Sequence, residues 1–198
     1  MTKGEDTRAN VLSAALALAS EDGLLGLSLG KLAERVGMSK SGLFAHFSSK
    51  ENLQVQILDE AAARFVATVV APALKAPRGE PRVRALFERW LGWKDAPFLP
   101  GGCIFIAAAV ELDDKPGVAR DRLVATQRDW LDTIAGAARI AVTEGHFRKN
   151  LDVHQFAHEF YSLAYGLHFL SRLLEDQKST ARTRLAFERL VRDARAAN

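Results

Sequence analysis

The feature that most constrains this chain is a helical repeat of apolar residues through almost all of its 198 residues. Apolar side chains return every three or four positions, which places them along one face of an α-helix. We find no segment with the strict alternation of a half-buried strand. Glycine, proline and capping residues divide the pattern into about nine segments. The sequence therefore predicts an all-α fold of about nine helices.

The composition is that of an ordinary globular protein, with 48% hydrophobic and 26% charged residues. These values exclude a disordered, collagen-like or membrane-bundle chain as a whole. A single cysteine excludes a disulfide framework and a four-cysteine zinc site. The 27 basic and 24 acidic residues give a net charge of +3, which permits an anionic partner without requiring one.

The N-terminus resembles a secretory signal, because Lys3 and Arg8 precede an apolar run over residues 11–19. Acidic residues at positions 5 and 6 and the interruption at Ser13 argue against export. The polar positions instead have helical spacing, so we expect a cytoplasmic helix. No run reaches the roughly 18 apolar residues that a membrane span needs, and no membrane partner is expected.

Residues 28–47 have the layout of a helix-turn-helix. Two short apolar-faced segments meet at Gly37, which supplies a turn geometry that a side chain would resist. Residues 28–50 carry four basic groups and one acidic group. Phosphate binding needs this kind of local positive charge, and the second helix of such a motif can enter the major groove of DNA.

The same segment resembles the DNA-binding domain of TetR-family transcriptional regulators. The resemblance covers residues 5–65 and rests on the predicted helix over residues 6–22, which carries Arg8, and on the stretch LSLGKLAERVGMSKSGLFAHFSSKENL. It implies that residues 66–198 form a larger helical domain that binds a small molecule and dimerises. The implied protein is a homodimeric repressor with a double-stranded operator as partner, without enzymatic activity or cofactor.

The family pattern assigns the DNA contacts residue by residue. Lys40 is the expected base reader, since lysine can donate to guanine O6 and N7. Phe44 stands where tyrosine is usual, so one phosphate hydrogen bond is absent while the ring can still pack on sugar or thymine. Ser48 and Glu51 also match a capping box that would begin the next helix. The implied DNA-binding residues are Ser28, Lys40, Ser41, Gly42, Phe44, His46, Ser48 and Lys50.

Three short enzyme-like patterns overlap the start of the first motif helix. Residues 26–30 match the nucleophile elbow G-x-S-x-G, but that elbow must follow a strand. Ser28 and Lys31 match S-x-x-K without its companion motifs, and Gly30-Lys31 lacks the rest of a phosphate-binding loop. We therefore expect no enzyme, and keep as the alternative a ligand-binding or enzymatic helical protein with an incidental helix-turn-helix.

Aromatic and apolar residues of the middle helices are candidates for an effector pocket. Such a pocket would suit a flat or apolar molecule of little charge. Glu111 or His168 could anchor a polar end of that ligand. The candidate set is Phe65, Trp90, Trp93, Phe105, Trp130, Ile134, Tyr161, Tyr165 and His168.

Three further features of this half leave alternatives open. His154 and His158 share a helix face, which suits a pocket or interface, an ordinary surface or a metal site, with no third ligand evident. Cys103 follows two glycines at a helix start, as in family members that sense electrophiles. The apolar residues that follow it in the sequence instead favour a structural role. A dimer interface of two helices per subunit is predicted over residues 152–195. Its candidate contacts are Leu163, Leu167, Leu170, Leu185 and Leu190.

Overall fold

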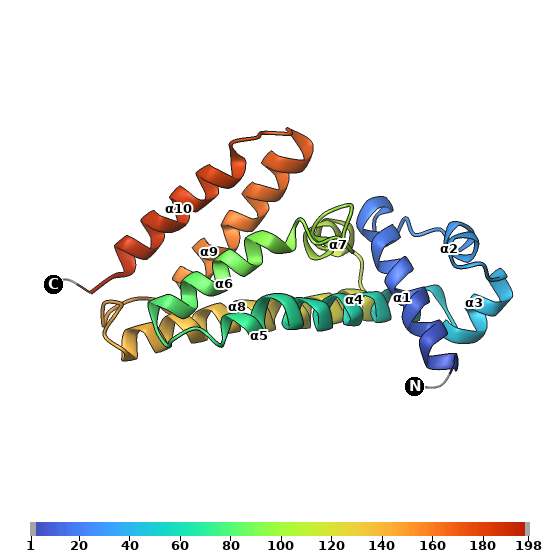
Figure 1. Cartoon of the computed structure of the whole chain (residues 1–198), viewed down its shortest axis with the longest axis horizontal. Helices are drawn as coiled ribbons and strands as arrows, with labels where there is room; N and C mark the ends of the chain where they lie inside the picture. The colour runs from blue at the N-terminus through green and yellow to red at the C-terminus, as the bar shows by residue number, and fades with distance from the viewer. Residues whose placement is uncertain (1–2, 197–198) are drawn as a thin grey trace. The chain divides into compact units, whose positions relative to one another are not determined.

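The structure is a computed structural model that describes residues 3–196, and it confirms the all-α prediction (Figure 1). Within these residues the only extended pairing is an isolated bridge between Phe147 and Arg195. The helices are α1 (Lys3–Asp22), α2 (Leu29–Val36), α3 (Lys40–Phe47), α4 (Lys50–Phe65), α5 (Ala71–Ala73), α6 (Glu80–Trp93), α7 (Ile104–Leu112), α8 (Val118–Thr143), α9 (Val153–His168) and α10 (Ser179–Ala194). Two π-helical turns, η1 (Val66–Val70) and η2 (Phe169–Leu173), extend α4 and α9.

The first compact unit joins the chain up to Phe65 to residues Asp95–Thr126. Within it α1 packs against α2, α4 and α7, and α3 packs against α2 and α4. Apolar side chains from each helix are almost fully buried there, as the exposures of Leu16, Leu32 and Leu43 show. The sequence predicts residues 95–126 within the second domain, whereas packing groups them with the helix-turn-helix.

The second compact unit comprises Val66–Lys94 and the chain from Gln127 onward. Its core is a cluster of aromatic rings contributed by α6, α9 and α10. Phe87 and Phe187 stack at 3.7 Å between ring centroids, and Phe160 meets both rings edge-on. The cluster therefore joins three helices that are far apart in the sequence.

Ion pairs on the surface of the second unit connect α6 to α10 and to the residue after it. Arg84 pairs with Glu188 at 2.6 Å and with Glu80 at 2.8 Å, and Arg195 also reaches Glu80 at 2.8 Å. The hydrogen bond from Arg195, followed by that from Arg84, holds the pKa of Glu80 below its usual value. These pairs are partly exposed, so each contributes little to stability on its own.

The start of α4 differs from the sequence prediction by one residue. Ser49, not Ser48, is the capping residue, because its Oγ accepts the backbone N–H of Asn52 at 3.0 Å. Ser48 ends α3 with φ at 62°, and Glu51 instead accepts the backbone N–H of Val118 at 3.3 Å. The predicted capping box was therefore wrong, since two adjacent serines offer competing caps and only packing selects between them.

Candidate nucleic-acid interface

Local capping defines both helices of the helix-turn-helix. Ser28 Oγ accepts the N–H of Lys31 at 3.3 Å at the start of α2, and Ser39 Oγ accepts that of Gly42 at 3.1 Å at the start of α3. Between them Gly37 adopts φ 66°, and the following N–H of Met38 donates to Ala33 O at 2.9 Å. These caps fix where α2 ends and α3 begins.

Helix α3 divides into a buried face and an exposed face. Leu43 and Phe47 are 1% and 2% exposed and anchor the helix on its unit. Lys40, Ser41 and Phe44 point away from this anchor and are exposed. The N-terminal part of α3 thus presents a cation, a hydroxyl and an aromatic ring together. This is the part of a recognition helix that reaches base edges.

The other DNA-binding candidates lie around this part of α3. Gly42, Ser28 and His46 are half-buried, and the ring of His46 tilts against Phe47 at 6.2 Å between centroids. Ser48 is exposed at the end of α3. Seven of the eight candidates therefore lie on α3 or at its two ends and at the start of α2, while Lys50 begins α4.

The basic residues near α3 differ in how they are held. Lys31 pairs with Asp22 at 3.0 Å, and Lys50 Nζ donates to the carbonyl of Leu25 at 2.8 Å. Lys40 forms no ion pair with any described residue, and its side chain lies over Gly30, where a Cβ would come within 3.2 Å of Lys40 Cε. Lys40 is therefore the cation of this surface that is available to an anionic or base partner.

Arg8 contacts the helices that carry this interface, a role that the sequence did not predict. Its guanidinium donates to Gln56 Oε1 on α4 at 2.7 Å and lies 6.0 Å from the centroid of the Phe47 ring. Arg8 therefore joins α1 to α4 beside the end of α3. The sequence signal for this role is the position of Arg8, which lies at helical spacing from the buried residues of α1.

The nine candidate effector residues do not form one site within either unit. Phe65 and Phe105 belong to the first unit, where their rings meet edge-on at 5.9 Å. The other seven belong to the second unit, where Trp90 and Trp130 are 6% exposed and pack against Phe160 as core.

The partly exposed members of this set lie along α9. The hydroxyl of Tyr161 donates to Gln127 Oε1, and its ring meets that of Tyr165 edge-on at 5.5 Å. His168 is half-buried, and this burial, followed by the charge of Arg172, lowers its pKa. These three side chains keep polar groups beside aromatic surface, as the sequence pattern suggested.

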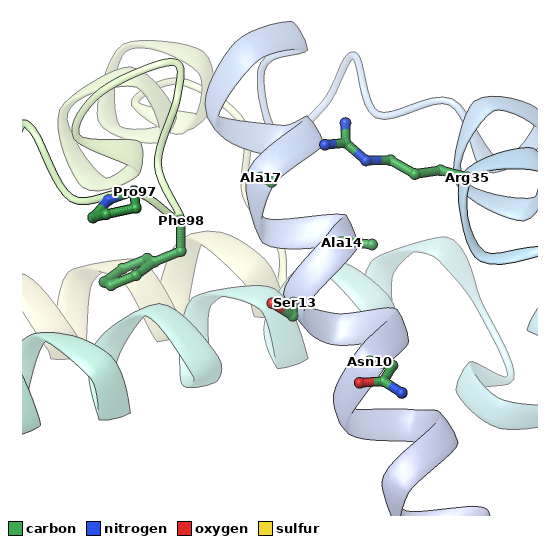
Figure 2. Close-up of a pocket in the computed structure, with 7 residues that line it drawn as sticks. All are labelled: Asn10, Ser13, Ala14, Ala17, Arg35, Pro97 and Phe98. Carbon is green, nitrogen blue, oxygen red and sulfur yellow. The ribbon is translucent and has the colours of Figure 1, made fainter.

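A pocket of about 490 Å³ lies elsewhere, on the outer face of α1. Figure 2 shows Pro97 and Phe98 on one side of α1 and Arg35 on the other. None of the nine candidate effector residues lines it. Its lining residues are Asn10, Ser13, Ala14, Ala17, Arg35, Pro97 and Phe98.

The interpretation of Glu111 as a ligand anchor is contradicted by its contacts. Its two carboxylate oxygens accept the backbone N–H groups of Leu24 and Leu25. The side chain is therefore committed to the connection between α1 and α2. Sequence alone offers no signal for a contact that spans 86 residues.

Cys103, His154 and His158 belong to no metal-binding cluster among the described residues. Cys103 is 7% exposed at the start of α7, which agrees with the structural reading of that residue. His154 and His158 are both exposed on α9. Among the described residues no group of three or more metal-ligating side chains comes together.

The leucine candidates for the dimer interface divide into core and surface. Leu167 is 2% exposed, so it belongs to the core of its own unit and does not fit an interface contact. Leu163, Leu170 and Leu190 are half-buried. A set of large apolar side chains on α9, η2 and α10, which we term the C-terminal apolar patch, remains exposed. It consists of Tyr165 (40%), Phe169 (51%), Leu173 (68%), Leu174 (57%) and Leu185 (54%).

Comparison with known proteins gives two family matches and many similar structures. Residues 11–63 match the bacterial regulatory proteins of the tetR family, and residues 79–187, more than half of the chain, match the tetracyclin repressor-like C-terminal domain. No curated protein matches the chain. Within the described residues no helix is long and apolar enough to cross a membrane.

Three solved structures illustrate the similarity. A TetR transcriptional regulator from Chloroflexus aurantiacus is 26% identical, with a TM-score of 0.88 and full coverage of both chains. A TetR-family regulator from Cytophaga hutchinsonii is 18% identical, with a TM-score of 0.89, covering 100% of this chain and 99% of that one. AibR, solved in complex with isovaleryl coenzyme A and operator DNA, is 21% identical, with a TM-score of 0.71, covering 90% of this chain and 97% of AibR.

Proposed function

Because the chain belongs to the TetR family of bacterial regulatory proteins, we propose that it is a homodimeric repressor that acts in the cytoplasm on a palindromic operator. Helices α2 and α3 bind the operator. A small apolar or aromatic molecule releases the protein from DNA. The observation that carries this proposal is the exposed N-terminal part of α3, where Lys40, Ser41 and Phe44 stand beside the buried anchor of Leu43 and Phe47.

Base reading falls to Lys40 in this proposal. Its ammonium group is a donor that can reach guanine O6 and N7 in the major groove. The Phe44 ring, 47% exposed, provides apolar contact for sugar or a thymine methyl. Gly42 adds no side chain and allows the backbone of α3 to approach the groove closely.

Phosphate contacts position the protein without reading sequence. Ser28 at the start of α2 and Lys50 at the start of α4 supply a hydroxyl, backbone N–H groups and a charge for this purpose. Lys50 is held by Leu25 O at 2.8 Å and exchanges this carbonyl for a phosphate when DNA is bound. Binding is therefore expected to weaken steeply as salt is raised.

Dimerisation is assigned to the C-terminal apolar patch. Several large apolar side chains exposed on elements that pack together are typical of an interaction surface. Helices α9 and α10 from each of two subunits can form a four-helix bundle that covers such a patch. Two-fold symmetry then places two α3 helices for half-sites about 34–36 Å apart, or a multiple of that distance.

The effector is proposed to bind in the second unit, beside the aromatic cluster. AibR was solved with an acyl-coenzyme A ligand and DNA, so a related fold accommodates both kinds of partner in that protein. In this chain Tyr161, Tyr165 and His168 combine aromatic surface with polar groups along α9. This lining suits a mainly apolar molecule with few polar anchors.

The test is binding of the full-length protein to a fluorescent duplex that the wild-type protein has selected from a random-sequence pool. Lys40→Ala should weaken binding about tenfold and relax base preference at one position of each half-site. Lys50→Ala should weaken binding of all duplexes alike and lower the salt slope by about one per subunit. Lys75→Ala, which removes an exposed lysine of the second unit, is the matched control and should change nothing. Failure to select any duplex would overturn the proposal.

A further inference from the structure

The connection between α1 and α2 is held by a carboxylate from a distant helix. Glu111 of α7 accepts the backbone N–H of Leu24 at 3.1 Å with one oxygen and that of Leu25 at 2.6 Å with the other. Both donors stand just after the end of α1, where no helical acceptor serves them. A charged acceptor makes such hydrogen bonds about twice as strong as neutral ones.

The carbonyl groups of the same two residues are held from the other side. Leu24 O accepts from Gln54 Nε2 at 3.2 Å, and Gln54 is buried. Leu25 O accepts from Lys50 Nζ at 2.8 Å. The peptide groups of Leu24 and Leu25 are therefore fixed by α7 through their N–H groups and by α4 through their carbonyls.

Two glycines show that α7 and its preceding loop lie tightly against the end of α1. Gly23 has φ at 85°, and a Cβ there would stand 2.2 Å from Glu111 Oε1. The N–H of Gly101 donates to Ser20 Oγ at 3.0 Å, and a Cβ on Gly101 would stand 1.6 Å from Ser20 O. The contact is therefore a tightly packed one, in which the backbone of α1 and its following turn lies close to α7 and its preceding loop at two points.

We propose that Glu111 is a positioning residue for operator binding. Its carboxylate fixes the course of residues 24 and 25, and only three residues further on Ser28 begins α2, against which α3 packs. Without the carboxylate, the connection samples other conformations and a smaller fraction of molecules presents α3 correctly. The apparent affinity for DNA falls in proportion to that fraction. This inference rests on the proposed function of the helix-turn-helix.

The test compares Glu111→Gln with Glu60→Gln in the full-length protein. Glu60 lies in the same unit and pairs with Arg64 at 2.7 Å, so both variants remove one negative charge from the first unit. Their general effects on attraction to DNA therefore cancel. On the duplex selected by the wild-type protein, Glu111→Gln should bind about tenfold more weakly than Glu60→Gln. Its salt slope should be unchanged, because the bound state makes the same phosphate contacts.

A second readout reports on the contact without DNA. Hydrogen exchange at the amides of Leu24 and Leu25 should be faster in Glu111→Gln than in Glu60→Gln, while the amides of α9 exchange at the same rate. Unchanged exchange at both leucines would overturn the inference. Glu111→Asp, which keeps the charge but shortens the side chain, should show the same pattern and serves if the glutamine variant does not fold.

The remaining outcomes separate this inference from the proposed function. If the wild-type protein selects a duplex and Glu111→Gln binds it as tightly as Glu60→Gln, or more tightly, Glu111 does not position α3 and the function stands. If the wild-type protein selects no duplex, the proposed function fails, whereas hydrogen exchange still tests the contact. If neither Glu111 variant folds by circular dichroism, Glu111 is a folding residue and the inference is wrong.

Discussion

Truncation of Leu185 is expected to weaken the proposed homodimer strongly. Leu185 is 54% exposed on α10, where it belongs to the C-terminal apolar patch. In the proposed four-helix interface this exposed part becomes buried. Leu185→Ala should therefore raise the dimer dissociation constant while leaving the fold of each subunit intact.

The magnitude follows from the exposed fraction. Full burial of a leucine side chain is worth about 1.5–3 kcal/mol, so covering the exposed half of Leu185 is worth about 1 kcal/mol. A symmetric dimer contains the residue twice, which gives about 2 kcal/mol in all. Since 1.4 kcal/mol is a factor of ten, the dissociation constant should rise about 30-fold.

Sedimentation velocity over a range of protein concentrations measures this constant. Leu74→Ala is the matched control, because Leu74 is also a leucine of the second unit and is 48% exposed outside the patch. The control should shift the constant less than about twofold, since single exposed leucines away from an interface contribute little. Equal shifts in the two variants, or a wild-type protein that stays monomeric at high concentration, would refute the interface.

Three further predictions concern other residues. Gly37→Ala should lower the free energy of unfolding by about 1 kcal/mol in urea titrations, because alanine is strained at φ 66°. His168 has a pKa below 6.5 in the folded state, so protonation favours unfolding and stability should fall as the pH drops below 6.5. His168→Gln should flatten this part of the profile. Cys103, 7% exposed, should react slowly with iodoacetamide in the native protein. Fast alkylation that releases DNA from the wild type but not from Cys103→Ser would instead identify a thiol sensor.

Local sequence signals predicted the helix-turn-helix because its structure is determined locally. The caps at Ser28 and Ser39 and the left-handed turn at Gly37 need only neighbouring residues. The shift from Ser48 to Ser49 shows the limit of such signals, since adjacent serines are equivalent until packing chooses one.

Contacts between distant segments could not be predicted in the same way. The apolar stripe of α9 suits both the core of its own unit and a partner subunit, so the sequence predicts Leu167 at the interface although it is core. The sequence predicts the aromatic candidates as one set, yet Phe65 and Phe105 pack in a different unit from the tryptophans. The sequence suggests Glu111 as a ligand anchor, because nothing in it reveals the contact of this side chain with Leu24 and Leu25.

The most direct test of the central claim is methylation protection of guanine N7 on the duplex selected by the wild-type protein. Guanine N7 lies in the major groove, where α3 is proposed to bind. We expect two symmetric groups of protected guanines about one helical turn apart, or a multiple of it, and Lys40→Ala should lose protection at one guanine in each group. Protection without two-fold symmetry, or DNA binding that leaves every guanine N7 reactive, would contradict recognition by a pair of α3 helices.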